Sequence, residues 1–253
     1  MANKEDKTIT ANIIADGPGE LTPEELESVI RASVGGLELT PEQIRKYIKY
    51  YNMLVERNRY VNLTRITSPT DAAQKHFADS LLGASLIKEN ARIVDVGTGA
   101  GFPGIPLAIA RPDIKLVLVD SLAKRVNFLR EVCEALGIPA EAVHARAEDA
   151  ARSDRLRGHF DHAVSRAVAP MNVLLELTVP FVKVGGSSLM YKGSAARDEL
   201  AVCGRALAEL KCKARLVDCE APWGARTIVA AEKLAPTPQR FPRKAGSIEK
   251  NPL

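Results

Sequence analysis

Short apolar runs alternate along this chain with longer segments whose apolar residues recur every three or four positions. Short runs rich in Val, Ile and Leu are typical of buried strands, and the longer spacing is typical of helices. The predicted strands are 93–96, 115–119, 143–147, 160–165, 188–191 and 226–231. Helical spacing appears at 122–136 and 195–210. Strands that alternate with helices predict an α/β fold built on a doubly wound, Rossmann-like sheet.

The residues before the first predicted strand have a different pattern. Thr22-Pro23 and Thr40-Pro41 each combine an N-cap hydroxyl with proline at the first helical position, which predicts two helices. The apolar stripe of the second helix is expected to pack on the sheet. The predicted division is a flexible extension at 1–20, an N-terminal helical region at 21–88, a sheet domain at 89–235 and a basic tail at 236–253.

The first predicted strand ends in Asp95 and leads into a loop rich in glycine. Glycine permits positive φ and lets a ligand lie against bare peptide groups, so the loop is expected to hold a nucleotide-like cofactor. A dinucleotide-binding loop has G-x-G-x-x-G directly after the strand, but Phe102 stands at the third position here. The pattern of Asp95, Gly97, Gly99 and Gly101 is instead similar to the first motif of S-adenosylmethionine-dependent methyltransferases. There the acid orders the loop and can face the methionine ammonium.

Two further acids follow predicted strands. Asp120 comes directly after 115–119, at the spacing expected of the acid that binds ribose hydroxyls. Glu148 lies at the end of 143–147, where a carboxylate or a backbone group can reach the adenine amino group. These positions place the cofactor in the crevice of a βαβ unit.

Composition narrows the class of protein without identifying it. The 253 residues, 46% of them hydrophobic, are enough for one domain with an appendage. No apolar run has the length of a membrane span, and the first residues do not form a signal peptide, so we expect a cytoplasmic protein. The four cysteines show no C-x-x-C pairing, so we expect reduced thiols and no metal site.

The formal charge of +4 is modest, but its placement in the tail indicates a nucleic-acid partner. Arg240, Arg243 and Lys244 lie between prolines, which favour an extended chain, and cations bind phosphates. Phe241 offers a ring that can stack on a base. We expect this tail to contribute to RNA affinity and not to cofactor affinity. Lys192, after the fifth predicted strand, either faces RNA phosphates or faces solvent.

The segment His76-Phe77-Ala78-Asp79-Ser80 contains the residue types of a hydrolase triad. Five consecutive residues cannot present a triad in its usual geometry, and the chain has no G-x-S-x-G motif, so we reject that interpretation.

Several long motifs in one order make a family resemblance specific. The chain resembles the bacterial ribosomal RNA small subunit methyltransferase G family, also called glucose-inhibited division protein B, over roughly residues 40–253. The motifs are Tyr60-Val61-Asn62-Leu63-Thr64, His76–Ser80, Asp95–Leu107, Asp120–Arg125, Ser165-Arg166-Ala167 and Pro242–Gly246.

The resemblance implies methylation of guanine N7 at position 527 of 16S ribosomal RNA, alone or in a small-subunit particle, with S-adenosylmethionine as the cofactor. It also implies cofactor contacts from Gly97, Phe102, Ala147, Glu148 and Arg166. No catalytic residue is assigned, although Arg166 is a candidate for positioning the cofactor or the base. The aromatic side chain of Phe102 replaces an aliphatic one seen in relatives.

The residues themselves agree with transfer to N7. The chain lacks the Asn/Asp-Pro-Pro-aromatic motif of amino methylation after the fourth predicted strand, and it has no cysteine there for pyrimidine carbon methylation. The alternatives are a non-catalytic RNA-binding protein and a small-molecule methyltransferase.

Overall fold

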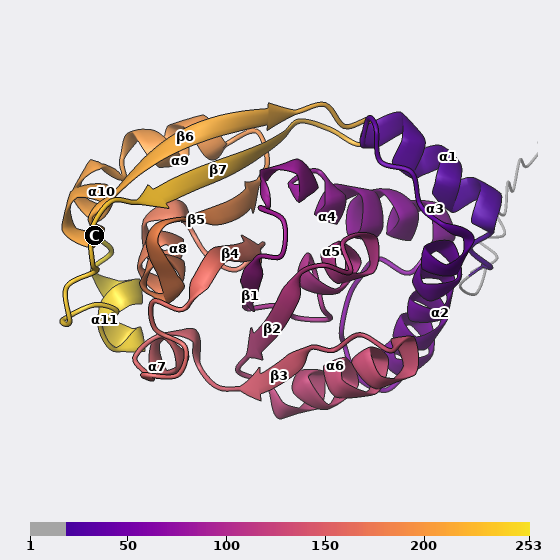
Figure 1. Ribbon diagram of the computed structural model, residues 1–253, viewed down its shortest axis with the longest axis horizontal. Coiled ribbons are helices and arrows are strands. Elements are labelled where there is room, and N and C mark those ends of the chain that lie inside the picture. The colour runs from indigo at the N-terminus through magenta and orange to yellow at the C-terminus, as the bar shows by residue number, and fades with distance from the viewer. Residues whose placement is uncertain (1–18) are drawn as a thin grey trace, which may run out of the picture.

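The computed structural model describes residues 19–253, which form a seven-stranded sheet with helices on both faces (Figure 1). The strand order is β3-β2-β1-β4-β5-β7-β6. The strands are β1 (Arg92–Val96), β2 (Lys115–Asp120), β3 (Glu141–His144), β4 (Phe160–Arg166), β5 (Val182–Lys192), β6 (Cys212–Cys219) and β7 (Arg226–Lys233). Strands β1 to β5 are parallel, and β7 pairs antiparallel with both β5 and β6. The predicted α/β class and doubly wound sheet are confirmed.

The central strands are buried on both faces, because successive side chains of a strand point to opposite sides. Ile93, Leu116 and Leu118 join one apolar cluster, whereas Val94 and Val117 join another. One face is covered by α2 (Pro41–Asn58), α5 (Gly104–Ala110) and α6 (Ala123–Leu136), which pack on one another. The other is covered by α7 (Ala147–Ala150), α8 (Met171–Thr178), η3 (Val179–Phe181), α9 (Ala196–Ala201), α10 (Gly204–Leu210) and α11 (Ala245–Lys250).

Two predicted elements differ from the structure, and one strand is additional. The third strand ends at His144, so Ala147 and Glu148 belong to the short helix α7. The helix predicted at 195–210 is two helices, with a break at Val202 and Cys203. Strand β6 was not predicted. It is an edge strand with charged residues at several positions, as edge strands commonly have, so its apolar alternation is weak.

The two predicted N-terminal helices form as expected, with Thr22 and Thr40 as their N-caps. They are α1 (Pro23–Ser33) and α2, and the apolar stripe of α2 is buried against α5 and α6. A further helical stretch follows as α3 (Pro69–Asp71), η1 (Ala72–Ala78) and α4 (Asp79–Leu81), and η2 (Ala84–Leu86) precedes the sheet. The middle part, η1, is a π-helix, a form that is frequent at functional sites.

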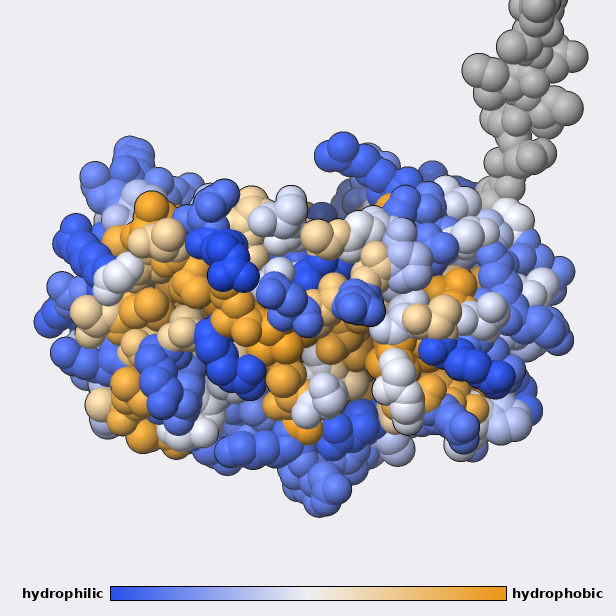
Figure 2. Space-filling model, turned by 90° about the horizontal axis from the view of Figure 1, so that it is seen from above, coloured by the Kyte–Doolittle hydropathy of each residue, from blue (hydrophilic) through white to orange (hydrophobic). Residues whose placement is uncertain are grey.

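The C-terminal segment corrects the expectation of an extended tail. Phe241, Ile248 and Leu253 are buried, and the segment ends in α11 beside α8 (Figure 1). Residues 1–18, most of the predicted flexible extension, lie outside the described residues. Gly19 is part of the fold, since its carbonyl accepts a hydrogen bond from the Tyr51 hydroxyl. Figure 2, which views the molecule from above relative to Figure 1, shows hydrophobic patches between hydrophilic residues.

The capping box at the start of α2 gives a stability prediction. Thr40 Oγ1 accepts from Gln43 N, the Gln43 side chain accepts from Thr40 N, and Gln43 Nε2 donates to the carbonyl of Ile109 in the last turn of α5. We expect Thr40→Ala to lower the free energy of unfolding by about 1 kcal/mol, because the capping hydroxyl is lost. Urea denaturation measures this, with exposed Arg45→Ala on the same helix as the control. Equal stability of Thr40→Ala and wild type would contradict it.

Candidate active site

A buried carboxylate organises the glycine-rich loop after β1. Asp95 Oδ2 accepts a hydrogen bond from Thr98 Oγ1 at 2.7 Å and another from Gly104 N at 2.8 Å. The loop is also held to the neighbouring strand, because the peptide nitrogens of Gly97 and Thr98 donate to the carbonyl of Val119. Gly97 and Gly99 have φ values of +70° and +62°, which favour glycine. The expected role of Asp95 in ordering the loop therefore has a direct geometric basis.

Asp95 does not face a cofactor cavity. Its residue is fully buried, and its Oδ1 has no hydrogen-bond partner among the described residues. Burial raises the pKa of Asp95 to about 7, although the hydrogen bonds from Thr98 and Gly104 act in the opposite direction. Loop atoms enclose this carboxylate, so the expected contact with the methionine ammonium stays a prediction without support from this geometry.

Asp120 connects the end of β2 to the same loop. Its Oδ2 accepts from Gly99 N at 2.9 Å, and its Oδ1 accepts from Leu122 N at 2.9 Å. Arg125 lies at 3.6 Å from Oδ2. The second predicted acid therefore lies beside the glycine loop, as the βαβ pattern requires.

A cavity of about 550 Å³ opens at this edge of the sheet. Four of the predicted cofactor residues line it, namely Gly97, Asp120, Ala147 and Glu148. Gly99 has open space where a Cβ would lie, so a ligand can approach its backbone there. By contrast, a Cβ at Gly101 would lie 2.5 Å from the Tyr50 hydroxyl, so this glycine serves packing under the loop.

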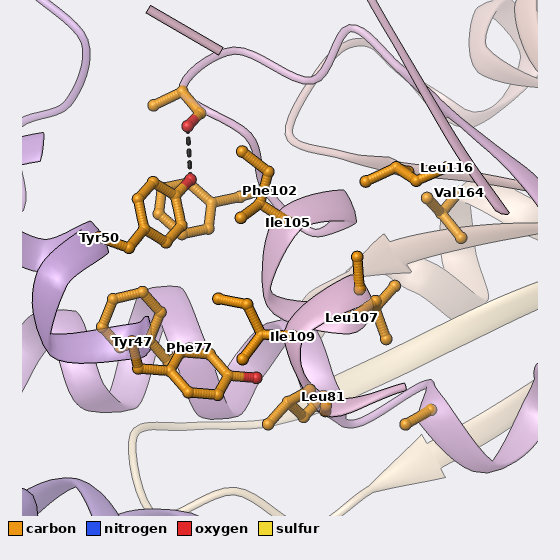
Figure 3. Packing of buried hydrophobic residues seen from close by; sticks show 14 of the residues in the cluster. Tyr47, Tyr50, Phe77, Leu81, Phe102, Ile105, Leu107, Ile109, Leu116 and Val164 are labelled. Carbon is orange, nitrogen blue, oxygen red and sulfur yellow. Dashed lines mark hydrogen bonds between the residues drawn. The ribbon is translucent and has the colours of Figure 1, made fainter. Parts of the chain in front are cut away.

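Phe102 lies beneath the loop in an aromatic cluster (Figure 3). Its ring stacks on His76 with a centroid distance of 4.2 Å and on Tyr50 at 5.4 Å. The Tyr50 hydroxyl donates to the carbonyl of Ala100 at 2.5 Å, the contact drawn as a dashed line in Figure 3. These contacts join α2 and η1 to the glycine loop, so the N-terminal helices support the site from below.

A second cavity of about 500 Å³ lies on the other side of the end of β4. Its lining includes His76, Asp79, Arg166, Lys192 and Arg226. Both cavities are lined by Ala167. Ala167 has φ +56°, a left-handed conformation uncommon for residues other than glycine and often found at functional sites. The two cavities thus meet at the chain reversal after β4.

An ion cluster forms one side of the second cavity. Asp79 Oδ2 accepts from Arg166 at 2.7 Å, and Oδ1 accepts from Arg226 Nε at 2.5 Å and Trp223 Nε1 at 3.1 Å. Burial acts to raise the pKa of Asp79, but the charge of Arg166 and these hydrogen bonds outweigh it, so the pKa lies below its usual value. Asp79 therefore stays ionised and fixes both guanidinium groups.

Sequence reasoning assigned Arg166 but did not assign Asp79, Trp223 or Arg226. The signals were weak: Asp79 lay in a motif whose hydrolase interpretation was rejected, and the only tryptophan preceded the last predicted strand by three residues. Rejection of the triad is confirmed, because Ser80 Oγ donates to the His76 carbonyl and Asp79 pairs with arginines. Burial, with the Arg166 charge, lowers the pKa of His76 to about 3, so this ring is neutral.

The predicted RNA-binding cations lie in different surroundings. Lys192 Nζ donates to Glu199 and to the Ala169 carbonyl, both at 2.8 Å, at the edge of the second cavity. Arg240 pairs with Glu209, and Lys244 is exposed. Arg243 binds the buried carboxylate of Glu176, and Phe241 is buried, so the expectation that Phe241 stacks on a base is wrong.

Within residues 19–253, no group of three or more His, Cys, Asp or Glu side chains is arranged to hold a metal ion. The helices of this part of the chain are too short or too polar to cross a bilayer.

Comparison with known proteins decides the family. The model of the family described as rRNA small subunit methyltransferase G, GidB, matches residues 43–226. The chain belongs to this family. A Ribosomal RNA small subunit methyltransferase G from Leuconostoc mesenteroides is 45% identical, over 87% of this chain and 95% of the relative. A relative of the same name from Desulfitobacterium hafniense is 47% identical, over 86% of this chain and 92% of the relative. The predicted family membership is confirmed.

Solved structures agree on the fold. The cofactor-bound Rv0187 from MTB has a TM-score of 0.54 at 18% identity, covering 85% of this chain and 99% of that one. A SAM-dependent methyltransferase from Aquifex aeolicus has a TM-score of 0.50 at 18% identity, covering 65% and 93%. The likeness confirms the predicted class I methyltransferase fold.

Folding shifts the pKa values of two buried groups, Asp95 and His76, in opposite directions. The pKa of Asp95 rises from 3.8 to about 7 on folding, so its contribution to stability falls as the pH rises through this window. The pKa of His76 falls from 6.5 to about 3, so its contribution is lost as the pH falls through that window. The two dependences offset each other where the windows overlap.

Asp95→Asn separates these two effects. We expect the free energy of unfolding of the variant, relative to that of wild type, to increase by roughly 1–4 kcal/mol from about pH 5 to about pH 8, because only wild type loses stability as Asp95 ionises. Urea denaturation across this range measures the difference. The control is Asp113→Asn, because the pKa of Asp113 is lowered to about 2 and titrates below the range. A variant difference that stays constant with pH would rule out a raised pKa.

Proposed function

We propose that this chain methylates guanine N7 at position 527 of 16S ribosomal RNA, with S-adenosylmethionine as the methyl donor. Membership of the rRNA small subunit methyltransferase G family supports the reaction class. The observation that carries the proposal is the meeting of two cavities at Ala167. One is bordered by the glycine loop and Asp120, and the other by hydrogen-bond donors.

The first cavity suits the cofactor. Gly97 lines this cavity, Gly99 leaves its backbone open to a ligand, and Asp120 stands where the ribose hydroxyls of such cofactors bind. Ala147 and Glu148 line the same cavity and are assigned to the adenine. Asp95, Gly101 and Phe102 act from beneath, by holding the loop in shape.

The second cavity suits the target base. The Hoogsteen edge of guanine presents two acceptors, N7 and O6, and adenine has an amino donor in place of O6. Arg166 and Arg226 supply donors, and Asp79 fixes their positions. Arg166, on β4 between the two cavities, is the candidate for positioning the base against the methyl group.

The chemistry requires alignment more than proton transfer. When bound, S-adenosylmethionine supplies a methyl group activated by a sulfonium. Guanine N7 has an in-plane lone pair and no proton to lose, so it would form the new N–C bond as the S–C bond to the methyl group breaks, releasing S-adenosylhomocysteine as the neutral thioether and leaving the positive charge on the methylated ring. A general base is not needed, in agreement with a neutral His76 and an Asp79 fully engaged by cations. Catalysis then rests on holding the two reactants in line.

In this proposal, the RNA binds over the opening of the second cavity. Lys192 and Arg226 border the opening, and Lys244 and Arg240 lie farther away on the C-terminal segment. Arg243 is the predicted contact with the weakest support, because its guanidinium is already bound to Glu176. The four free thiols of the described residues agree with a reducing, cytoplasmic location.

Site mapping tests the whole proposal. Purified protein is incubated with S-adenosylmethionine and either a 16S transcript or small ribosomal subunits, and the product is digested and mapped. We expect N7-methylguanosine at one position. Methylation of another atom would refute the assignment, and activity on small molecules alone would favour a small-molecule methyltransferase. Cofactor binding without methyl transfer to either RNA would favour the non-catalytic alternative.

Gly99→Val tests the cofactor cavity. The branched side chain would project into the open space above the loop, where the ligand approaches backbone. We expect affinity for S-adenosylhomocysteine to fall roughly tenfold or more, a cost of about 1.4 kcal/mol. Calorimetry measures the affinity, and circular dichroism checks that the variant folds. Gly137→Ala is the control for backbone strain, since it has φ +62° at the end of α6, away from the cavity. Unchanged affinity in folded Gly99→Val would exclude this site.

Arg226→Met tests the base cavity. The change removes a charged donor but keeps much of the side-chain volume, so we expect kcat/KM for RNA to fall roughly 10- to 100-fold. Affinity for S-adenosylhomocysteine should remain at the wild-type value, because Arg226 does not line the first cavity. Exposed Arg197→Met is the control for lost surface charge. Equal losses in the two variants would mean that Arg226 contributes only charge.

A further inference from the structure

The C-terminal segment is fastened to the fold by a buried ion pair. Glu176 on α8 is fully buried, and its carboxylate accepts from Arg243 Nε at 2.9 and 3.1 Å and from the second guanidinium nitrogen, Nη2, at 2.6 Å. The backbone nitrogen of Arg243 donates to the same carboxylate at 2.7 Å. Arg243 Nη1 donates to the Asn251 carbonyl at 2.9 Å, so the same side chain also holds the end of α11.

Two more arginines hold the approach to α11. Arg152 donates to the Pro242 carbonyl at 2.5 Å, and Arg157 donates to the carbonyls of Thr237, Pro238 and Phe241. Apolar contacts complete the attachment, since Phe241 and Leu253 are buried in one cluster with residues of α8. Arg152, Arg157 and Arg243 therefore bind protein groups and fix the path of the chain.

That path ends at the cofactor cavity. Ile248, Glu249 and Pro252 line the cavity that Gly97, Asp120 and Glu148 also line. Val173 and Leu177 of α8 lie between them as part of the same lining. The segment thus reaches, through folding, a cavity that is about 150 residues away along the sequence from its glycine loop.

We propose that residues 245–253 form a wall of the S-adenosylmethionine site and contact the adenosine portion of the cofactor. The inference rests on the proposed function of the first cavity. Adenosine is assigned because Asp120 and Glu148, which suit ribose and adenine, share this cavity with the segment. Ile248 and Pro252 supply the apolar surface that a heteroaromatic ring prefers, and Glu249 supplies an acceptor. Arg243 and Glu176 are positioning residues, which hold the wall without contact with the ligand.

This assignment gives Arg243 a different role from the one expected of a basic tail. A cation that binds phosphate must have donors free for the RNA, whereas three Arg243 nitrogens already donate within the protein. The segment is therefore expected to affect cofactor affinity more than RNA affinity.

The first test introduces a large side chain at an exposed position of this segment that lines the cavity. Glu249→Trp places a large side chain there, and Lys250→Trp places the same side chain on an adjacent exposed residue that does not line the cavity. We expect Glu249→Trp to weaken binding of S-adenosylhomocysteine roughly tenfold or more, and Lys250→Trp to bind as wild type. Calorimetry measures both, and filter binding of a 16S transcript is expected to give wild-type RNA affinity for each.

The ion pair is tested separately. We expect Arg243→Met to raise the KM for S-adenosylmethionine while kcat at saturating cofactor stays near wild type, and Arg205→Met, at an exposed position of α10, to change neither. Hydrogen exchange of the peptide 245–253 is measured with and without S-adenosylhomocysteine. Binding is expected to slow exchange in wild type, and Arg243→Met is expected to raise exchange of this peptide in the free protein.

The outcomes separate the inference from the proposed function. If the wild-type protein does not bind S-adenosylhomocysteine, the proposed function fails. If wild type binds but Glu249→Trp binds equally well, and exchange of 245–253 does not slow with ligand, the wall is refuted while the cofactor site stands. If Glu249→Trp or Arg243→Met loses RNA affinity and keeps cofactor affinity, the segment is an RNA contact instead. If Arg243→Met does not fold, the inference is decided by the comparison of Glu249→Trp with Lys250→Trp and by hydrogen exchange of 245–253 in wild type.

Discussion

The buried carboxylate of Asp95 is the constraint on which the site depends. A charge in a place without water is unfavourable, and here it is stabilised by donors from its own loop, Thr98 and Gly104. Those two hydrogen bonds close the loop between β1 and α5, so that the peptide of Gly99 faces the second acid, Asp120. The hydrogen bonds of Asp95 therefore fix both the shape of the loop and the position of the Gly99 peptide beside Asp120. Burial also raises the pKa of Asp95. The ionised carboxylate therefore lowers the stability of the folded protein, while its hydrogen bonds hold the loop in shape.

The aromatic cluster around Phe102 packs the glycine-rich loop against the N-terminal helices. Phe102 stacks with His76 and Tyr50, and Arg166 lies 5.2 Å from its ring centroid. Phe102 thus touches residues of α2, of η1 and of β4 at once. The π-helical form of η1 places His76 against this ring while Asp79, directly after η1, reaches Arg166 and Arg226. One packed cluster therefore supports both cavities, so the helices before the sheet help to shape the proposed site.

Much of the sheet, and part of the lining of the first cavity, could be predicted, because both depend on local patterns. The apolar runs of β1, β2 and β4, the glycine loop, and acids at strand ends are legible within a few residues of one another. The ion cluster was not predictable in this way. Asp79, Arg166 and Arg226 are distant in sequence, and only the strand order brings β4 and β7 to the same side of α4. Strand β6 was missed because its charged residues suit an edge and hide its alternation.

The error over the C-terminal segment has a more general cause. Clustered cations indicate a polyanion partner only when their charges remain in solvent, and sequence does not reveal which carboxylate will meet them after folding. Glu176 lies in an apolar stretch of α8, where an unpaired charge would be very unfavourable, so the buried acid requires a cation. Arg243 meets that requirement. A lone acid in an otherwise apolar helix was therefore the available sign that one of the tail's cations belongs to the protein interior. The prolines, which suggest an extended chain, also suit a chain that crosses a surface before a short helix.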